Sequence, residues 1–428
     1  MRNKVKKKIL VVSYTFPPTP GIGGRRWAKF SKVLVQKGWN VDVIAAKITR
    51  DSESVWMKDV LHFEKHISYI NSGYPHHLTR EANNLIDKIA YRIELILVKL
   101  FSKGNYYDRS IFWKKKIKKA IADKIEQKDV KYIVATGAPF GYLSQIIDLK
   151  TRFPNVIFIA DLRDPWSYNE TSYGWSGLSI KRKKAELNKE EKVVAKFDKI
   201  ITVSAEIAKG LREKHKNCKE IMVIENGYDL DDLPISIEEN EKDEKDEIRF
   251  VFAGTFYPNA HKYLFDFISG IQSFNLLNLN KSFKFRFQFF GEVNSEFLEI
   301  TKNIPEIEFK GRISLVDAHK KMNEATYALL FLTDDINYSI STKFCEYILH
   351  ELPVIVFGKF GYTMQFVEEN SLGWGCSGGK DMWLNVLLEI YNLNQSNQKK
   401  VISKDSISQL DIKYITEKLI NNVLICGE

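Results

Sequence analysis

The sequence predicts an α/β protein with two successive parallel β-sheets, each covered by helices on both faces. Three observations support this fold class. The 428 residues are too many for one ordinary hydrophobic core. Short β-branched segments alternate with longer helical segments, which is typical of parallel sheets. An acidic segment without aromatic residues, 231–247, interrupts this alternation, which resumes at Ile248.

The first half has the order of elements expected of a Rossmann-like domain. Each expected strand is an apolar run that ends at a polar or glycine-containing loop, and a helix at Trp27–Lys37 separates the first two. The strands are expected at Lys8–Ser13, Val41–Ala45, Tyr132–Thr136, Val156–Asp161, Lys199–Val203 and Ile221–Ile224.

The second half repeats the pattern, so we expect a second Rossmann-like domain. Its strands are expected at Ile248–Ala253, Phe285–Phe290, Ile307–Phe309, Tyr327–Leu332 and Pro353–Val356. The predicted division is a first domain over 1–230, an acidic linker or loop over 231–247, a second domain over 248–410 and a C-terminal helix over 411–428. Whether this last helix returns to the first domain stays open.

Composition limits where the protein works. A hydrophobic content of 44% argues against general disorder. The four cysteines form no CxxC pair, which favours a reducing compartment without disulfides or a zinc site. The apolar run after the basic N-terminus is too short for a signal peptide, and no run of about 18 apolar residues predicts a membrane span. We therefore expect a cytoplasmic protein.

The charge is distributed unevenly between the two halves. Residues 1–230 hold 44 Lys and Arg against 25 Asp and Glu, whereas the remainder holds 20 against 29. A basic first half suits an anionic lipid surface, a lipid diphosphate or nucleic acid, although a lysine-rich surface also serves solubility alone. No nucleic-acid-binding module is recognisable, and the second half is acidic, so we expect no nucleic acid.

A glycine-rich loop follows the first expected strand. Gly21, Gly23 and Gly24 allow close backbone approach, and the helix that begins near Arg25 offers its N-terminus to an anion. The spacing is not the GxGxxG dinucleotide fingerprint. Because Asp42 lies inside the second strand instead of at its end, a nicotinamide site is the weaker alternative, beside a simple flexible turn.

Two further candidate anion sites lie in the second half. After the strand at Ile248–Ala253, a loop and a helix start bring together Gly254, Thr255, Asn259, His261 and Lys262. Near residue 340, a Ser/Thr-rich cap opens a helix that carries Lys343 and Glu346 three positions apart. A lysine there can pair with a phosphate and a glutamate with ribose hydroxyls, or the two can form a surface ion pair.

Charged residues also follow the strand at Val156–Asp161. Asp161, Arg163 and Asp164 cluster with Trp166, a combination suited to a sugar or an anionic acceptor. The alternative is a structural Arg–Asp network, because charges directly after an apolar strand are costly unless paired.

With these segments, the chain resembles glycosyltransferase family 4, the retaining enzymes with the two-domain GT-B fold. The resemblance runs from Lys8 to about Leu424, and its seven segments occur in the family's order. They are the glycine-rich loop with Arg26 and Trp27, Ala135–Phe140, Asp161–Trp166, Ile201–Ile207, Glu225–Asp229, Ala253–Tyr257 and Thr342–Gly358.

The resemblance implies two domains that face each other across a cleft, with the acceptor in the first and the nucleotide sugar in the second. It implies catalytic roles for Asp161, Arg163, Asp164 and Lys343, and acceptor binding by Arg25, Thr136, Gly137 and Trp166. The implied donor-binding residues are Gly23, Gly24, Arg26, Gly254, Thr255, Asn259, His261, Lys262, Gly291, Ser341, Thr342, Lys343 and Glu346. No cofactor or metal is expected besides the nucleoside-diphosphate sugar.

The chain departs from the family's pattern at three positions. Tyr338 stands where the family has the first of two glutamates, and Thr255 and Ala260 replace an arginine and a lysine common in the family. The charge that meets the phosphates must then come from His261, Lys262, Lys343 or Arg26.

Together these features predict transfer of a sugar from a nucleoside diphosphate to a hydroxyl acceptor, with retention, in bacterial surface polysaccharide or glycoconjugate synthesis. The alternatives are a nucleotide-sugar 2-epimerase of the same fold and a catalytically inactive partner subunit. The acceptor is a glycan or a lipid-linked sugar.

One segment bears on the acceptor. Leu85–Phe101 is amphipathic, with a broad apolar face and Lys88, Arg92 and Lys99 along it. It fits either a membrane interface, which would make the protein peripheral, or a core helix of the first domain, and the sequence slightly favours the core helix.

Overall fold

The structure is a computed structural model of the 428-residue chain, and it divides into two compact units. Unit 1 comprises Met1–Ile224 and Thr416–Glu428, and unit 2 comprises Glu225–Ile415. The structure describes residues 7–48, 54–80, 82–167, 172–234, 247–277, 279, 282–336 and 338–425. Most of the predicted acidic linker, residues 235–246, therefore lies outside the described part.

Unit 1 is built on a parallel sheet whose strand order is β3-β2-β1-β4-β5-β6-β7. The central strand β1 pairs with β2 on one side and β4 on the other, so that Val11 lies beside both Val43 and Val134. The strands are β1 (Lys8–Ser13), β2 (Asn40–Lys47), β3 (Ile67–Asn71), β4 (Tyr132–Gly137), β5 (Ile157–Leu162), β6 (Lys199–Thr202) and β7 (Ile221–Val223).

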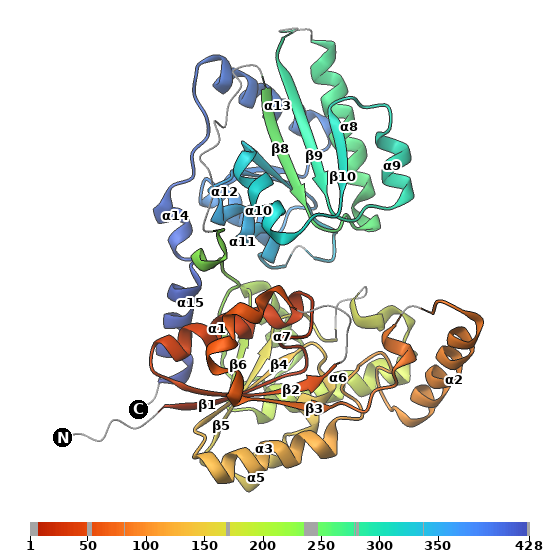
Figure 1. Ribbon diagram of the computed structural model, residues 1–428, viewed down its shortest axis with the longest axis vertical. Coiled ribbons are helices and arrows are strands. Elements are labelled where there is room, and N and C mark those ends of the chain that lie inside the picture. Colours follow the sequence, from red (N-terminus) through yellow and green to blue (C-terminus); the bar gives the residue numbers. More distant parts are fainter. Residues whose placement is uncertain are drawn as a thin grey trace, which may run out of the picture. The chain divides into compact units, whose positions relative to one another are not determined.

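Helices cover both faces of this sheet, with α1 on one side and α3 and α5 on the other (Figure 1). The main helices are α1 (Arg25–Gln36), α2 (Leu85–Phe101), α3 (Lys114–Lys128), α4 (Gly141–Gln145), α5 (Asp148–Arg152), α6 (Ile180–Lys196) and α7 (Ala205–Lys214). The end of the chain also belongs to unit 1, because Lys199 Nζ donates to the carbonyl of Val423 at 2.5 Å.

Unit 2 repeats the architecture with six parallel strands in the order β10-β9-β8-β11-β12-β13. They are β8 (Glu247–Ala253), β9 (Lys284–Phe290), β10 (Ile307–Gly311), β11 (Tyr327–Phe331), β12 (Val354–Phe357) and β13 (Gly373–Cys376). Its helices are α8 (His261–Leu276), α9 (Ser295–Thr301), α10 (Leu315–Glu324), α11 (Thr342–Leu349), α12 (Tyr362–Glu369), α13 (Lys380–Gln395) and α14 (Lys404–Ser408). The last α-helix, α15 (Ile412–Leu419), spans the boundary between the units and continues as a π-helical turn at Ile420–Leu424.

The sheet of unit 2 separates two hydrophobic cores. Because side chains alternate along a strand, Phe250 and Phe252 of β8 enter one core while Val251 enters the other. The first core is rich in phenylalanine and contains Phe267 of α8 and Trp383 of α13. The second contains the buried side of α11. The uninterrupted apolar sequences of β11 and β12 reflect burial on both faces of the sheet, whereas β9 and β10 alternate apolar with polar residues.

The fold class predicted from the sequence is confirmed, and every predicted strand is present within one or two residues at each end. Two strands were missed. β3 is an edge strand whose residues are mostly half-buried, and β13 (GWGC) contains two glycines and only four residues. Both lack the apolar, β-branched run by which the others were recognised.

The preferred interpretation of Leu85–Phe101 as a core helix is wrong. The segment is the helix α2, which the structure describes from end to end, but Val98 is its one buried residue. Most of its leucines and isoleucines face outward instead of toward the sheet. The sequence gives the period of an amphipathic helix, but it does not give the side on which the rest of the domain lies.

Trp383 tests the packing of unit 2. Its ring is fully buried, and it stacks on Phe267 with 5.7 Å between ring centroids. Trp383→Ala leaves a large cavity, so we expect the free energy of unfolding of this unit to fall by about 3–5 kcal/mol. Urea unfolding followed by circular dichroism measures the loss. Phe360→Ala is the control, because Phe360 is 54% exposed and its removal leaves no cavity; equal losses would contradict the packing described here.

Candidate functional site

In unit 2, two glycines lie at the carboxyl ends of neighbouring strands. The N–H of Gly254, after β8, donates to the carbonyl of Phe290 at 2.8 Å, and the N–H of Gly291, after β9, donates to the carbonyl of Gly311 at 2.8 Å. Gly291 has a φ of 121°, and a Cβ there would lie 2.2 Å from the Gly254 carbonyl oxygen. No larger residue fits at Gly291, so the two backbone segments approach closely at the edge where ligands of such sheets bind.

The Lys343 side chain packs directly against Gly254. A Cβ on Gly254 would come within 2.2 Å of the Lys343 Cε, so the glycine makes room for the lysine side chain. Lys343 Nζ donates to the carbonyl of Thr255 at 2.9 Å and lies over the Phe252 ring at 4.8 Å. The structure therefore brings together four sequence-predicted donor residues, Gly254, Thr255, Gly291 and Lys343.

The environment of Lys343 weakens its hold on a proton. Burial lowers the pKa of Lys343 to about 8, and the negative charge of Glu346 opposes this only in part. Because Lys343 is partly neutral near pH 8, a second negative charge beside it would stabilise the charged ammonium form. The Lys343 side chain is partly buried and its Nζ donates to the Thr255 carbonyl, while the charge of Glu346 acts on it from the same helix.

The helix that carries Lys343 begins with a capped first turn. Ser341 is the N-cap of α11, and its hydroxyl accepts a hydrogen bond from the N–H of Phe344 at 3.2 Å. Thr342 is the first helical residue. The N-terminal end of α11, with its partial positive charge, thus lies on the same segment as the lysine.

The remaining cationic candidates of unit 2 are held by carboxylates. Lys262 Nζ lies 2.5 Å from Asp334 Oδ2 and stays exposed, and this hydrogen bond raises the pKa of Lys262. His261 Nδ1 lies 2.7 Å from Glu296 Oε2. Asn259, in the short turn before α8, is exposed and carries no charge. Lys343 is therefore the cation best placed at the glycine pair.

A cavity of about 540 Å³ opens beside the glycine pair. Thr255 and Gly291 line it together with Glu292 and Arg312. Glu292 and Arg312 form an ion pair, and sequence reasoning missed both. A signal was present, because each directly follows a glycine at a strand end: Gly291 comes just after β9, and Gly311 is the last residue of β10.

In unit 1, Asp161 is the centre of a buried hydrogen-bond network. Its carboxylate is 0% exposed and accepts from Trp27 Nε1 at 2.6 Å and from Thr136 Oγ1 at 2.8 Å. Arg26 Nε lies 3.2 Å from the same carboxylate, and Arg26 Nη2 also donates to the carbonyl of Ile224 at 2.8 Å. This geometry favours the structural Arg–Asp network over direct catalysis by Asp161 or donor binding by Arg26.

Arg163 connects the glycine loop to the strand ends. Its Nη1 donates to the carbonyl of Gly23 at 2.5 Å, and its Nη2 donates to the carbonyl of Ala138 at 3.4 Å. Asp164 Oδ2 lies 3.7 Å from Arg163 Nε. Gly24 packs against the backbone of residue 16, where a Cβ would come within 3.1 Å of the Cα. The predicted glycine loop and the Asp161–Trp166 segment are therefore neighbours in space.

Two acceptor candidates serve structural purposes. Arg25 is buried, with its guanidinium over the Trp56 ring at 5.2 Å. Gly137 packs against Phe140, where a Cβ would lie 2.2 Å from the ring. Trp166, in contrast, stacks on Phe140 with 5.1 Å between ring centroids, and both rings border a cavity.

This cavity, of about 560 Å³, is the second hollow at a strand-end edge. Three residues predicted from the sequence line it: Gly23, Arg163 and Trp166. Most of its wall was not predicted: Tyr74, Tyr107, Asp108, Arg109, Trp175 and Glu186 come from loops and from α6. The local signal is the dense Tyr106–Arg109 run (YYDR), whose approach to residue 166 depends on tertiary structure.

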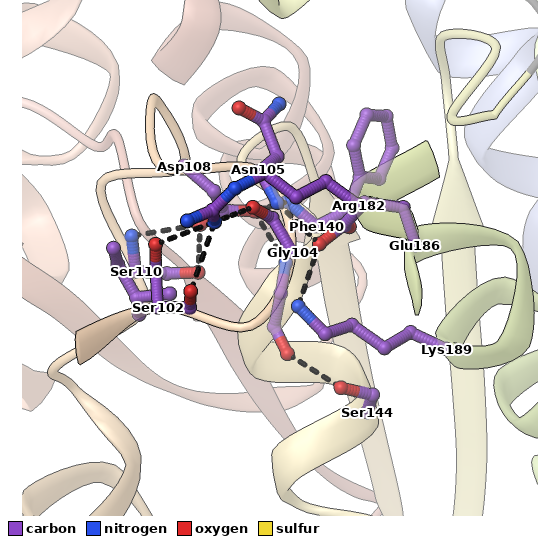
Figure 2. A network of polar contacts seen from close by, with 12 residues as sticks. Ser102, Gly104, Asn105, Asp108, Ser110, Phe140, Ser144, Arg182, Glu186 and Lys189 are labelled. Carbon is purple, nitrogen blue, oxygen red and sulfur yellow. Dashed lines mark hydrogen bonds and ion pairs between the residues drawn. The ribbon is translucent and has the colours of Figure 1, made fainter. Parts of the chain in front are cut away.

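A polar network stiffens one wall of this cavity (Figure 2). Asp108 accepts hydrogen bonds from the N–H groups of Phe140 and Gly141, at 3.1 Å and 2.7 Å. Glu186 accepts from Asn105 N–H at 2.8 Å and from Trp166 Nε1 at 2.9 Å. Burial, helped by the nearby charge of Glu186, raises the pKa of Asp108. Both carboxylates hold the loops that carry the aromatic wall.

Comparison with known proteins gives a fold but no family. No family model matches the chain, and no curated protein matches it. Among solved structures it is similar to a sucrose-phosphate synthase from Thermosynechococcus elongatus, with a TM-score of 0.61, 11% identity, and coverage of 96% of this chain and 97% of that one.

Two further structures span nearly the whole chain. WaaG, a glycosyltransferase involved in lipopolysaccharide biosynthesis, has a TM-score of 0.56 and 11% identity, covering 98% of this chain and 100% of its own. A putative UDP-N-acetylglucosamine 2-epimerase from Listeria monocytogenes has a TM-score of 0.52 and 10% identity, covering 97% and 95%. At these identities the likeness shows the GT-B fold alone.

The Asp161 network yields a stability prediction. Asp161→Ala removes the acceptor shared by Arg26, Trp27 and Thr136, and with it the negative charge that faces the buried Arg26 guanidinium. We expect the free energy of unfolding of unit 1 to fall by about 3–5 kcal/mol. Chemical unfolding measures it. Asp148→Ala, at an ion pair whose carboxylate is 70% exposed, is the control and should cost no more than about 1 kcal/mol. Similar small losses at both positions would contradict the network's structural role.

Proposed function

We propose that the chain is a glycosyltransferase that moves a sugar from a nucleoside-diphosphate donor to a hydroxyl acceptor. The observation that carries the proposal is the placement of Lys343 against Gly254 and Thr255 at the strand ends of unit 2. An ammonium group, two closely packed glycines at the strand ends and the start of α11 form a site for a diphosphate. The fold shared with a sucrose-phosphate synthase and WaaG supports the same function.

The reaction asks the protein to stabilise a diphosphate as it leaves the sugar. In this proposal the charge that develops on the leaving diphosphate meets Lys343 and the N-terminal end of α11. Glu346, one turn further on, accepts the ribose hydroxyls. Retention at the anomeric carbon is part of the proposal and rests on the resemblance to glycosyltransferase family 4.

The acceptor side of the proposal rests on the cavity of unit 1. The stacked rings of Trp166 and Phe140 offer an apolar plane suited to a sugar ring, and Arg163 supplies a cation beside it. An acceptor glycan or lipid-linked sugar fits such a wall, and WaaG is involved in lipopolysaccharide biosynthesis. We therefore propose a role in surface polysaccharide or glycoconjugate synthesis. The free cysteines Cys218, Cys345 and Cys376 are consistent with a cytoplasmic location.

A nucleotide-sugar 2-epimerase is the second candidate, because the Listeria epimerase shares the fold. The two functions differ in what happens without an acceptor. An epimerase interconverts two nucleotide sugars, whereas a transferase slowly releases the free nucleoside diphosphate. Nuclear magnetic resonance of the nucleotide sugar separates these products.

The function is tested by ligand-induced stabilisation. We expect one of UDP, GDP or dTDP to raise the melting temperature, with a stabilisation of about 2.7 kcal/mol at about one hundred times its dissociation constant. Lys343→Ala should remove most of this shift and lower donor turnover by about 10²–10³-fold. Lys302→Ala is the matched control, since Lys302 is exposed and paired with Glu299 of α9. An unchanged shift and turnover in Lys343→Ala would refute the assignment.

The lowered pKa of Lys343 gives a separate pH prediction. Near pH 8 about half of the Lys343 side chains are neutral, because the pKa is about 8. A bound diphosphate favours the charged form and raises this pKa, so binding should take up roughly half a proton at about pH 8 and almost none at about pH 6.5. Isothermal titration calorimetry in buffers of different ionisation enthalpy measures the uptake. Lys343→Arg, which stays charged, should abolish it, and an uptake that persists in this variant would assign the proton elsewhere.

A further inference from the structure

The helix α2 turns its apolar side to solvent. Eight leucine, isoleucine and phenylalanine side chains on it are between 46% and 77% exposed. We call them the apolar stripe: Leu85, Ile86, Ile89, Ile93, Ile96, Leu97, Leu100 and Phe101. Their spacing of three and four residues puts them on one side of a helix about 25 Å long. A continuous apolar surface of this kind marks an interaction site.

A row of basic side chains borders the apolar stripe. Lys88, Arg92 and Lys99 are all exposed, and their positions place them together along one edge of the stripe. The two acidic residues of the helix, Asp87 and Glu94, lie on the other side. There Glu94 binds His77: its carboxylate accepts a hydrogen bond from the His77 backbone N–H at 2.9 Å and lies 2.8 Å from the ring Nδ1. The outward side is thus apolar and positive.

The inward side fixes the orientation of the helix. Val98 is buried against Tyr106, Trp175 and Leu178, and Leu95 packs on the same cluster. These contacts show that α2 packs on unit 1 through one side. It is held in unit 1 with its apolar stripe turned away from the domain.

An arginine from α6 secures the end of the helix (Figure 2). Arg182 Nη1 donates to the carbonyls of Ser102 and Gly104, at 2.9 Å and 2.7 Å, and Nη2 donates to the carbonyl of Lys99 at 2.6 Å. These bonds satisfy carbonyl groups in the last turn of α2 and in the turn after it. Lys181 and Lys184, on either side of Arg182 in the sequence, are exposed and add positive charge near this end.

We propose that α2 docks unit 1 on an anionic membrane surface, lying in the plane of the interface with the apolar stripe among the lipid chains and the basic row at the headgroups. Amphipathic helices with lysine and arginine along the polar border bind in this way. Among the described helices, none is both long and apolar enough to cross a bilayer. A second copy of α2 fits the stripe less well, since both carboxylates of this helix are half-buried and none is exposed opposite the basic row.

The docking helix lies next to the cavity of unit 1. Tyr74, Leu78 and Trp175 line this cavity, and the same three residues belong to the cluster on which Val98 packs. Docking therefore brings the acceptor cavity to the lipid surface. This consequence rests on the proposed function, whereas the docking itself does not, because it follows from α2 alone.

Vesicle flotation tests the docking. We expect the full-length protein to float with vesicles of phosphatidylcholine and phosphatidylglycerol, and to float poorly with phosphatidylcholine alone or at high salt. Ile89→Glu with Ile96→Glu should abolish flotation. Lys88→Gln and Arg92→Gln should each weaken binding roughly fivefold. Leu276→Glu is the control: Leu276 is 81% exposed, but it lies on α8 of unit 2, so flotation should not change.

Two measurements keep the result interpretable. The variants should melt like the wild type, because the changed side chains are exposed, and they should keep the nucleotide-induced stabilisation described above. Sedimentation velocity gives the mass in solution. A wild-type protein that does not float, a double glutamate variant that floats normally, or a dimer that this variant splits into monomers would each overturn the proposal. If the wild-type protein floats with the vesicles but no nucleotide stabilises it, the result counts against the proposed function alone.

Discussion

A parallel sheet that is covered on both faces leaves only its ends for polar chemistry. Strands β1, β4, β11 and β12 are almost wholly apolar, and polar or glycine residues gather where these strands end. Ligand groups must therefore come from the loops at one edge and from the helix starts that follow. This constraint explains why Gly254 and Gly291, from neighbouring strands, meet within van der Waals distance, and why Arg163 reaches the loop of Gly23. The candidate sites are consequences of the topology as much as of individual residues.

The strand-end edges of the two units hold charged groups in contrasting environments. Asp161 is buried with enough donors to satisfy its carboxylate, and its partners come from α1 and β4, so it ties the helix after the glycine loop to the sheet. Lys343 has one carbonyl acceptor and aromatic rings beside it, and burial lowers its pKa. A satisfied charge stabilises a fold, whereas an under-satisfied one gains most when a ligand of opposite charge arrives. This difference, which residue types alone do not reveal, separates the structural group from the functional candidate.

The sequence predicted the fold well because its signals are local. Apolar runs ending at glycine or polar loops identified eleven strands, and a lysine just after a Ser/Thr cap identified the start of α11. The missed strands, β3 and β13, are short edge strands without such runs. The candidate site was predicted only in part. Gly254, Gly291 and Lys343 gather as expected, but Asp108 and Glu186 reach the unit 1 cavity from separate segments. Their proximity is set by tertiary contacts, which a single sequence does not encode in any periodic pattern.

The helix α2 shows where a pattern is correct and its interpretation is not. The spacing of apolar residues determines which of them share a side of a helix, but a helix that faces a core and one that faces lipid have the same spacing. The distinguishing fact is the position of the buried contacts: on α2 they lie opposite the apolar stripe, around Val98. The basic row at the border of the stripe was visible in the sequence. On a helix that faces a core, cations at this border would be costly to bury. Charge at the edge of an apolar face, more than the size of that face, is therefore the feature that indicates a lipid surface.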